Sequence, residues 1–332
     1  LVAIVSCAFF AAISGSSAAT TAAIGGIMYP EMVKRGYPSD YSTAVQAVGG
    51  TLGIIIPPSI VFVIYGSTNG VSISKLLMSG MLPGILTAVV LCLYGYVVAK
   101  KENFPKSFDQ FSLKRVLKSL KGAVWALMMP LIILGGIYGG IFTPTESAMI
   151  ACAYGLVVSF FVTKELTVKN FFDVVSKTAA STANVTVMFL AAQVFGFLIA
   201  YYDITTTIAN FFVAVSPNWI IFMGLVFILL TITGMFMEVG ATNVILSPLL
   251  APVAAAFGID PIHFGMVFVF LLALGQATPP FGSTMFIACG ISGERVAAVI
   301  RRLLPFVLVE YACALVFAYV PWFSTFLPSL MA

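Results

Sequence analysis

The sequence predicts an all-α polytopic membrane protein with two inverted repeats, each containing a re-entrant helical hairpin and a broken transmembrane helix. Hydrophobic residues make up 61% of the 332 positions, and charged residues make up only 8%. Soluble domains carry about 25% charged residues, so lipid is expected to cover most of this surface. The apolar runs are continuous, whereas strands of a membrane barrel alternate apolar and polar residues. The spanning elements are therefore predicted to be helices.

Seven helices are expected to cross the bilayer, because each holds an apolar run close to the roughly 20 residues that a crossing needs. They cover residues 39–65, 75–99, 123–142, 146–163, 171–200, 261–289 and 295–320. Residues 1–36 and 218–257 instead carry paired apolar arms of about 12–16 residues, which are short for a crossing. We expect these two segments to be re-entrant hairpins.

The repeat is visible in the residues that break helices. A shift of 222 residues superimposes Pro30 on Pro252, Pro57-Pro58 on Pro279-Pro280, Pro83 on Pro305, Gly36 on Gly258 and Gly53 on Gly275. Proline and glycine set backbone shape, so the repeated property is shape and not mere apolarity. An odd number of expected crossings separates the hairpins, which would invert the second copy. Inverted repeats with interrupted helices indicate a secondary transporter whose site lies near the membrane midplane.

The expected organisation is a first repeat over 1–99, a basic loop over 100–122 and a second repeat over 123–332. The first repeat comprises hairpin 1–36, broken helix 39–65 and helix 75–99. The second comprises scaffold helices 123–215, hairpin 218–257, broken helix 261–289 and helix 295–320. Only the second repeat has scaffold helices before its hairpin, so we expect a missing N-terminal portion of about 100 residues and a full subunit of about 430.

Basic residues predict the orientation. With these crossings, fifteen of the sixteen Lys and Arg residues fall on one side, seven of them in loop 100–121, and Lys75 alone falls on the other. Because cytoplasmic loops are enriched in Lys and Arg, loop 100–121 is expected to be cytoplasmic and the C-terminus periplasmic. The net charge of +4 reflects this bias and implies no nucleic-acid partner.

Each repeat contains two breaks. A small polar cluster at 14–21 is matched by 233–243, and a double-proline segment at 53–59 is matched by 275–284. A double proline removes two backbone donors and frees the carbonyls of the preceding turn. In lipid such carbonyls need protein, water or a ligand, and an alkali cation is one such ligand. The alternative is that the small residues serve only close helix packing and the prolines only kinks.

At these residues the chain resembles the large membrane (M) subunit of tripartite ATP-independent periplasmic (TRAP) transporters. The stretches that carry the resemblance are Ala11–Met32, 49–59 and 272–286. It implies a prokaryotic inner-membrane protein that imports an organic acid anion on a sodium gradient, with about two or more sodium ions and no organic cofactor. It also implies a small membrane (Q) subunit, a periplasmic substrate-binding protein and an elevator mechanism, in which hairpins and broken helices move against a static scaffold.

The resemblance implies two sodium sites, one in each repeat. The first would use Ala11, Ser14, Gly53, Ile56 and Pro58, and the second would use Gly234, Gly275, Thr278 and Phe281. Their carbonyl and hydroxyl oxygens suit a hard cation. The anion would lie between the sites, on helix N-termini and hydroxyls supplied by Ser14, Ser16, Ser17, Thr20, Thr21, Ser59, Gly282 and Ser283.

Three acids fall in or near apolar runs. We expect Glu146 to be a helix N-terminal acid, Glu238 at the second hairpin tip is a site candidate, and Glu310 is a candidate contact for a scaffold partner. The five cysteines are interpreted as small buried hydrophobes. The single histidine, His263, excludes histidine-rich metal chemistry.

Other functions fit the sequence less well. An intramembrane serine protease would need a histidine at the depth of Ser16 and Ser17, and His263 falls on another loop. A passive channel would not need two inverted hairpins. The closest rival is a sodium/carboxylate symporter of related architecture that works without a binding protein. Sialic acid, other acid sugars and C4-dicarboxylates stay open as substrates, and the resemblance favours sialic acid.

Overall fold

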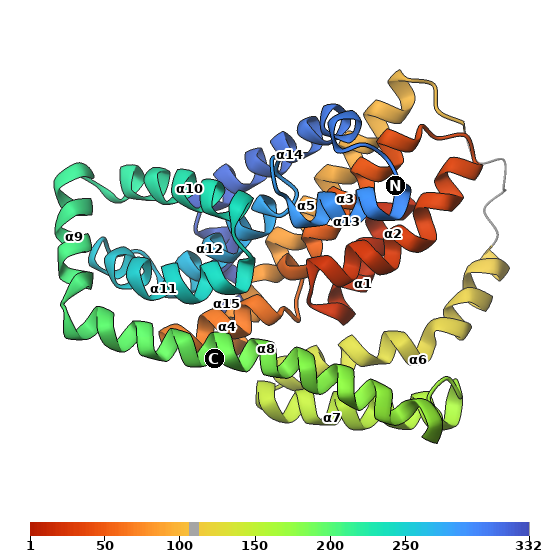
Figure 1. Ribbon diagram of the computed structural model, residues 1–332, viewed down its shortest axis with the longest axis horizontal. Helices are drawn as coiled ribbons and strands as arrows, with labels where there is room; N and C mark the ends of the chain where they lie inside the picture. The colour runs from red at the N-terminus through yellow and green to blue at the C-terminus, as the bar shows by residue number, and fades with distance from the viewer. Residues whose placement is uncertain (106–112, 332) are drawn as a thin grey trace. The chain divides into compact units, whose positions relative to one another are not determined.

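The computed structural model describes residues 1–105 and 113–331, and every regular element among them is a helix. These residues form two compact units, 1–105 with 191–332 and 106–190, which are described separately below. The helices are labelled in Figure 1. In the described part, six helices are long and apolar enough to cross a membrane, or seven when a bent pair counts as one span.

The first unit begins with five helices: α1 (Val2–Ser14), α2 (Ser17–Lys34), α3 (Ser39–Ile55), α4 (Ile60–Asn69) and α5 (Ile73–Lys101). It continues with the end of α8 (Val168–Tyr201), then α9 (Ile204–Val215), α10 (Trp219–Phe236), α11 (Val239–Ala256), α12 (Pro261–Gly275), α13 (Ser283–Ser292), α14 (Val296–Tyr319) and α15 (Trp322–Ser329). The same sequence of hairpin, broken helix and long helix thus occurs twice.

The bounds of several helices coincide after the 222-residue shift. α2 maps from its first to its last residue onto α11, and α3 and α12 begin at matched residues. The Pro57-Pro58 and Pro279-Pro280 peptide bonds are both cis. Pro30 and Pro252 lie inside α2 and α11, and Gly36 and Gly258 follow them with φ of 86° and 74°. The local backbone is therefore the same at matched positions.

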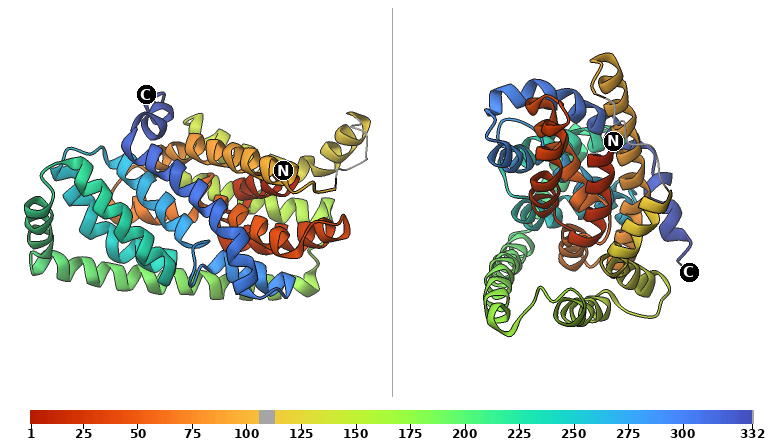
Figure 2. Two further views of the ribbon diagram at one scale, coloured as in Figure 1. Left: turned by 90° about the horizontal axis from the view of Figure 1, so that it is seen from above. Right: turned by 90° about the vertical axis from the view of Figure 1, so that its right-hand side faces the viewer.

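Each hairpin packs on the broken helix that follows it in the chain. α1 and α2 contact α3, and α10 and α11 contact α12. Figure 2 shows α10 and α11 beside α12. The second half of each broken helix packs on the other repeat: α4 packs on α11, and α13 packs on α2 and α3 (Figure 1). Both hairpins and both broken helices therefore share one core.

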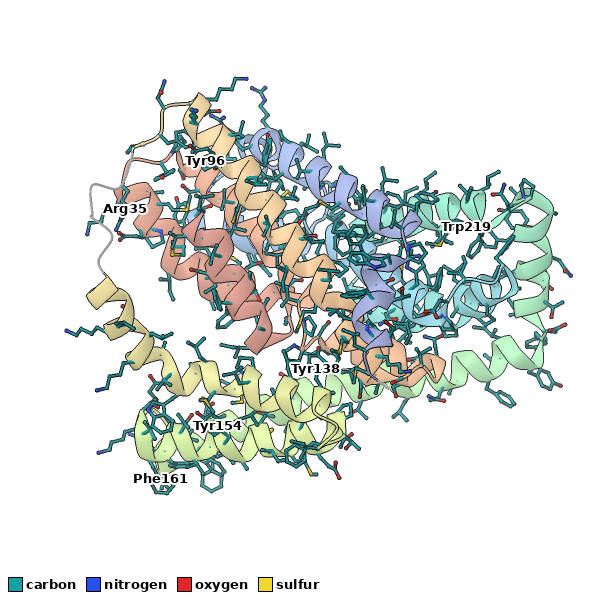
Figure 3. All side chains as sticks on the ribbon, turned by 180° about the vertical axis from the view of Figure 1, so that it is seen from behind. Arg35, Tyr96, Tyr138, Tyr154, Phe161 and Trp219 are labelled. Carbon is teal, nitrogen blue, oxygen red and sulfur yellow. The ribbon has the colours of Figure 1, made fainter. Side chains whose placement is uncertain are left out.

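That core is apolar at its centre but contains several hydroxyls. α3 is buried over nearly its whole length, and Ala44, Val48 and Leu52 are fully buried. Ala11, Ile56 and Ala277 belong to one hydrophobic cluster that joins the two repeats. By contrast, apolar side chains such as Leu93 and the labelled Tyr96 on α5 point outward (Figure 3), as expected of a lipid-facing surface.

The second unit contains α6 (Leu113–Tyr138), α7 (Pro144–Val157), a π-helical turn (Val158–Val162) and the start of α8, with α6 packed on α7. A capping box begins α7: Thr143 Oγ1 accepts from the Glu146 N–H at 3.3 Å, and Glu146 Oε2 accepts from the Thr143 N–H at 2.8 Å. The prediction that Glu146 is a helix N-terminal acid is confirmed. The capping box therefore explains why an acid occurs in this apolar run.

Several expected boundaries shift. Within the predicted loop 100–122, α5 continues to Lys101 and α6 begins at Leu113, while 106–112 lies outside the described residues. The prediction of hairpin arms of about 12–16 residues is wrong for three arms, because α2, α10 and α11 each have 18 residues. α15 was not expected, and it is bent by 62° from α14 just after Pro321.

Candidate functional site

The first hairpin turns at Gly15, directly against the break between α3 and α4. Gly15 has φ of +61°, and its carbonyl accepts a hydrogen bond from the Ile60 N–H at 3.3 Å. A Cβ on Gly15 would lie 2.6 Å from the Pro58 carbonyl oxygen. Only glycine satisfies both the left-handed backbone and this approach. The tip and the double-proline break, predicted separately from sequence, therefore meet.

Glycines on α3 let α2 approach at backbone distance. A Cβ on Gly53 would lie 2.5 Å from the Ser16 carbonyl oxygen and 2.7 Å from Thr20 Oγ1. A Cβ on Gly50 would lie 1.8 Å from Thr21 Oγ1. The contact brings the hydroxyls and carbonyls of the hairpin to the turn of α3 that precedes the break.

The oxygens of this first site are bonded mainly to one another. Ser14 Oγ lies 2.8 Å from Thr20 Oγ1 and 3.3 Å from the Ser16 carbonyl. The Ser17 hydroxyl donates to the Thr51 carbonyl at 3.5 Å, and the Thr21 hydroxyl donates to the Ser17 carbonyl at 2.9 Å. The result is a compact group of hydroxyl and carbonyl oxygens that carries no formal charge. Such oxygens suit a weakly held alkali cation, whereas a carboxylate would need hydroxyl protons or backbone N–H groups as donors.

The remaining predicted residues of the first site lie around this group. Ala11 is fully buried, and its carbonyl accepts from the Gly15 N–H at 3.1 Å. Ile56 contributes a buried side chain to the shared cluster. Ser59 is the N-cap of α4 and accepts from the Phe62 N–H at 3.5 Å. As an acceptor, Ser59 Oγ is therefore used by its own helix, as Ser16 Oγ is by α2 through the Ala19 N–H, and each hydroxyl still has a proton to donate.

The second site is built around a contact between two glycine backbones. A Cβ on Gly275 would lie 2.5 Å from the carbonyl carbon of Gly234, and one on Gly234 would lie 3.2 Å from Gly275 Cα. The chain positions are 41 residues apart, yet the end of α10 and the end of α12 touch without intervening side chains. Two of the predicted sodium residues are thus brought together.

The break after α12 folds back on itself. The Gln276 carbonyl accepts from the Thr284 N–H at 3.0 Å and from the Thr284 hydroxyl at 2.9 Å. A Cβ on Gly282 would lie 2.6 Å from that carbonyl oxygen. Ser283 is the first residue of α13 and is exposed. The freed carbonyl expected from the double proline is therefore satisfied here by Thr284, the last residue of the break segment 275–284.

Thr278 lies in this break and is nearly fully buried. Its hydroxyl lies 2.7 Å from the Leu274 carbonyl and 3.0 Å from the Tyr311 hydroxyl. Phe281, predicted beside it, has a side chain that is 60% exposed and packs on Phe236 at a ring distance of 5.6 Å. Phe281 can therefore contribute only its backbone oxygen to a cation site, since its ring has no oxygen.

The acids near the site have structural partners. Glu238 caps α11, and its Oε2 accepts from the Ala241 N–H at 2.9 Å. Glu310 is fully buried and lies 2.6 Å from the Thr51 hydroxyl on α3. The described contact of Glu310 is therefore with a helix that carries the first site, and its contact with a scaffold partner stays a prediction. The sequence marked Glu310 as an acid in an apolar run but not its partner.

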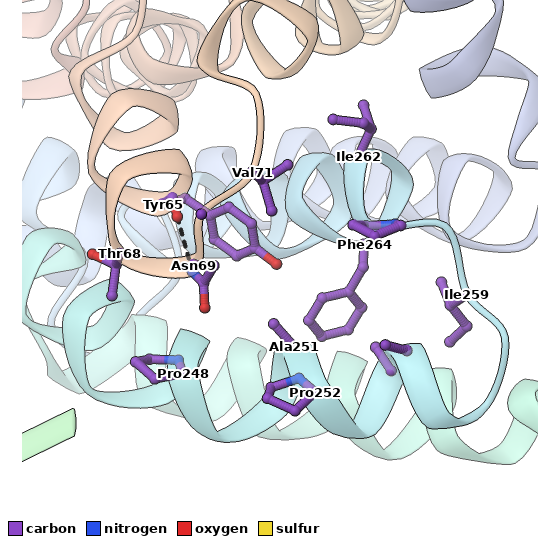
Figure 4. A pocket seen from close by; sticks show the side chains of 14 residues that line it. Tyr65, Thr68, Asn69, Val71, Pro248, Ala251, Pro252, Ile259, Ile262 and Phe264 are labelled. Carbon is purple, nitrogen blue, oxygen red and sulfur yellow. Dashed lines mark hydrogen bonds between the residues drawn. The ribbon is translucent and has the colours of Figure 1, made fainter. Parts of the chain in front are cut away.

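A separate cavity of about 640 Å³ lies between α4, α11 and the start of α12 (Figure 4). The Tyr65 and Thr68 hydroxyls in its lining have no hydrogen-bond partner among the described residues. Asn69 bonds across to Ser247 on α11 at 2.8 Å. None of the residues predicted for the sodium or substrate sites lines this cavity.

The long apolar helices and their outward-facing apolar side chains define a multi-pass helical membrane protein. Residues 1–323 match the model of the family described as tripartite ATP-independent periplasmic transporter, DctM component. The chain belongs to this family. It corresponds to the large permease component of TRAP transporters, and its apolar helices indicate a multi-pass protein of the bacterial inner membrane.

Individual relatives of the chain belong to the same family of TRAP transporter permeases. The chain is 42% identical to the isethionate TRAP transporter permease DctMQ of Oleidesulfovibrio alaskensis over 95% of its own length and 50% of that protein. It is 37% identical to the C4-dicarboxylate TRAP transporter large permease DctM of Vibrio cholerae, over 99% of the chain and 77% of that protein. It is 33% identical to the sialic acid TRAP transporter permease SiaT of Haemophilus influenzae, over 97% of the chain and 52% of that protein. These relatives are permeases and not enzymes, so the protease alternative is rejected.

Proposed function

We propose that this chain imports an organic acid anion into the cell, driven by a sodium gradient, with the anion delivered by a periplasmic binding protein. The observation that carries the proposal is the twofold occurrence of a hairpin tip held at backbone distance from a broken helix, at Gly15 with Pro58 and at Gly234 with Gly275. Broken helices that expose backbone groups inside a membrane protein are where transporters bind ions and substrates.

The proposal includes two sodium sites and an anion site between them. The first sodium ion is assigned to Ala11, Ser14, Gly53, Ile56 and Pro58, and the second to Gly234, Gly275, Thr278 and Phe281. The anion is assigned to the hydroxyls and helix N-termini near Ser14–Thr21, Ser59 and Gly282–Ser283. The uncharged oxygens around Ser14 support this assignment, because they attract cations without trapping them.

The two halves are proposed to be inverted repeats that move together as an elevator. Coincident helix bounds after the 222-residue shift support the repeat. Leaving out the 12-residue α9, which is short for a crossing, five helical segments separate the α1–α2 and α10–α11 hairpins, counting α3 with α4 and α7 with its π-turn. The packing of both hairpins and both broken helices in one compact unit supports a common moving body. α10 and α11 are each long enough to cross, so their re-entrant placement rests on the α12 contacts.

The proposed orientation places loop 100–121 in the cytoplasm and the C-terminus in the periplasm. Arg302 on α14 supports it, because its guanidinium pairs with Asp40 at 3.2 Å and with Glu102. These contacts place the start of α3, the end of α5 and the start of α14 at one end of the unit, where most of its basic residues occur.

The proposed partners are a small membrane (Q) subunit and a periplasmic substrate-binding (P) protein. The relatives' names state isethionate, C4-dicarboxylates and sialic acid, which are all organic acids. The substrate class is therefore an organic acid anion, with sialic acid and C4-dicarboxylates as the first to test and isethionate added because of the 42% identity.

The test is uptake of labelled acids into proteoliposomes containing the full membrane complex, with and without an inward sodium gradient and with and without the binding protein. Uptake that requires both supports the proposal. Sodium-driven uptake without the binding protein would favour the rival symporter. Uptake that is indifferent to sodium would overturn both cation sites.

A further inference from the structure

Tyr311 lies outside the predicted sites, but its side chain contacts a residue of the second one. It lies on α14, and its hydroxyl is 3.0 Å from Thr278 Oγ1 in the break after α12. Its ring packs on Phe227 of α10 at a centroid distance of 5.9 Å. The ring is thus held independently of the hydroxyl, and the hydroxyl reaches a buried oxygen assigned to the second cation.

Proton counting fixes the direction of this hydrogen bond. Thr278 Oγ1 lies 2.7 Å from the Leu274 carbonyl oxygen, which can only accept. The single hydroxyl proton of Thr278 is therefore donated to Leu274, and Tyr311 must be the donor to Thr278. One lone pair of Thr278 Oγ1 accepts from Tyr311, and the other stays available. The two bonds together fix the direction in which Thr278 presents that lone pair.

The pair of hydroxyls is present in only one repeat. The 222-residue shift places Ile56 opposite Thr278 and Val89 opposite Tyr311, so both partners are apolar in the first repeat. Val89 is 49% exposed, whereas Thr278 and Tyr311 face each other. The threonine and its tyrosine donor therefore occur together or are absent together.

We propose that Tyr311 is a positioning residue for the second cation site: by donating to Thr278 it orients the threonine oxygen toward the bound sodium ion. The proposal rests on the proposed sodium-driven import. It predicts that loss of the Tyr311 hydroxyl weakens sodium binding at the second site. Sodium binding at the first site and the maximal rate of uptake should stay unchanged.

The experiment measures uptake against sodium concentration for the full complex in proteoliposomes, normalised to folded protein. Tyr311→Phe keeps the ring contact with Phe227 and removes only the hydroxyl. We expect the half-saturating sodium concentration to rise about 2- to 10-fold, the range for loss of one ordinary hydrogen bond, with the rate at saturating sodium unchanged. The matched control is Tyr319→Phe on the same helix, whose hydroxyl donates to the Ile220 carbonyl at 3.1 Å. It should titrate like the wild type.

A double-mutant cycle separates positioning from a general structural role. Thr278→Val removes the oxygen that Tyr311 is proposed to orient, so adding Tyr311→Phe to it should cause no further rise in half-saturating sodium. Additive effects, or a Tyr311→Phe variant with wild-type sodium dependence, would overturn the inference. A variant that loses rate equally at all sodium concentrations would also overturn it. A wild type that ignores sodium would refute the proposed function itself, which is a separate outcome.

Discussion

The two breaks share one backbone plan but take their oxygens from different places. At the first, the hydroxyls come from the hairpin, and Ser14, Ser17 and Thr20 bond within it or to α3. At the second, the hydroxyls of Thr278 and Thr284 lie on the broken helix itself, while the hairpin contributes a glycine backbone. Backbone shape is repeated, but side-chain chemistry is repeated only in part: the shift places Thr20 on Thr242, whereas Ile56 falls on Thr278. The two sites are therefore expected to differ in ion affinity, and they can be perturbed separately.

The largest effect should come from the glycine contacts. Gly275→Ala places a Cβ 2.5 Å from the Gly234 backbone, which cannot move aside as a flexible side chain could. We expect a loss of about 1–3 kcal/mol of stability and of nearly all uptake. Gly53→Ala meets a carbonyl at 2.5 Å and should behave similarly. Thermal unfolding in detergent and sodium-driven uptake provide the two measurements.

Gly290→Ala on α13 is the control for these variants, since nothing lies within 4 Å of its Cβ position. It should keep full uptake, with a small gain in helix stability. Wild-type uptake by Gly275→Ala would show that the close backbone contact is not required, and the second site would need a different construction.

An intermediate effect is expected for Ser14→Ala. The substitution removes the hydroxyl that lies 2.8 Å from Thr20 Oγ1 and 3.3 Å from the Ser16 carbonyl. We expect the half-saturating concentration of substrate or sodium to rise about 2- to 10-fold, with folding preserved. Thr87→Val is the matched control, because the hydroxyl of Thr87 donates to the Pro83 carbonyl within α5 at 2.7 Å and not to a residue assigned to either site. Normal transport kinetics in Ser14→Ala would remove Ser14 from both assignments.

The smallest effect should come from Arg302→Gln. Arg302 pairs with Asp40 and Glu102, but all three side chains are one-third exposed, so solvent screens the charges. We expect a loss of about 0–1 kcal/mol in unfolding free energy that shrinks further in high salt. A large loss would mean that this end of the unit is held mainly by the ion pairs and not by packing. Arg301→Gln serves as a neighbouring control of the same charge change.

The sequence by itself determined the class of protein, the family and the positions of the helix breaks. Low charge content and continuous apolar runs leave helices in lipid as the consistent structure. Proline and glycine act on the local backbone, so Pro57-Pro58 and Pro279-Pro280 marked the breaks before any contact was known. Glu146 was understood for the same reason, since a capping box is complete within four residues.

Only the tertiary structure decided which distant groups meet. Gly234 touches Gly275, Thr51 bonds Glu310, and Tyr311 donates to Thr278. Each of these contacts joins different helices, and no periodicity in the sequence encodes which face of α14 turns toward which break. Hairpin arms of 18 residues likewise exceeded the estimate from apolar runs, because helices continue through small polar residues once a neighbouring helix covers them. Local backbone preferences are set by residue type, whereas long-range pairings depend on how the finished helices pack.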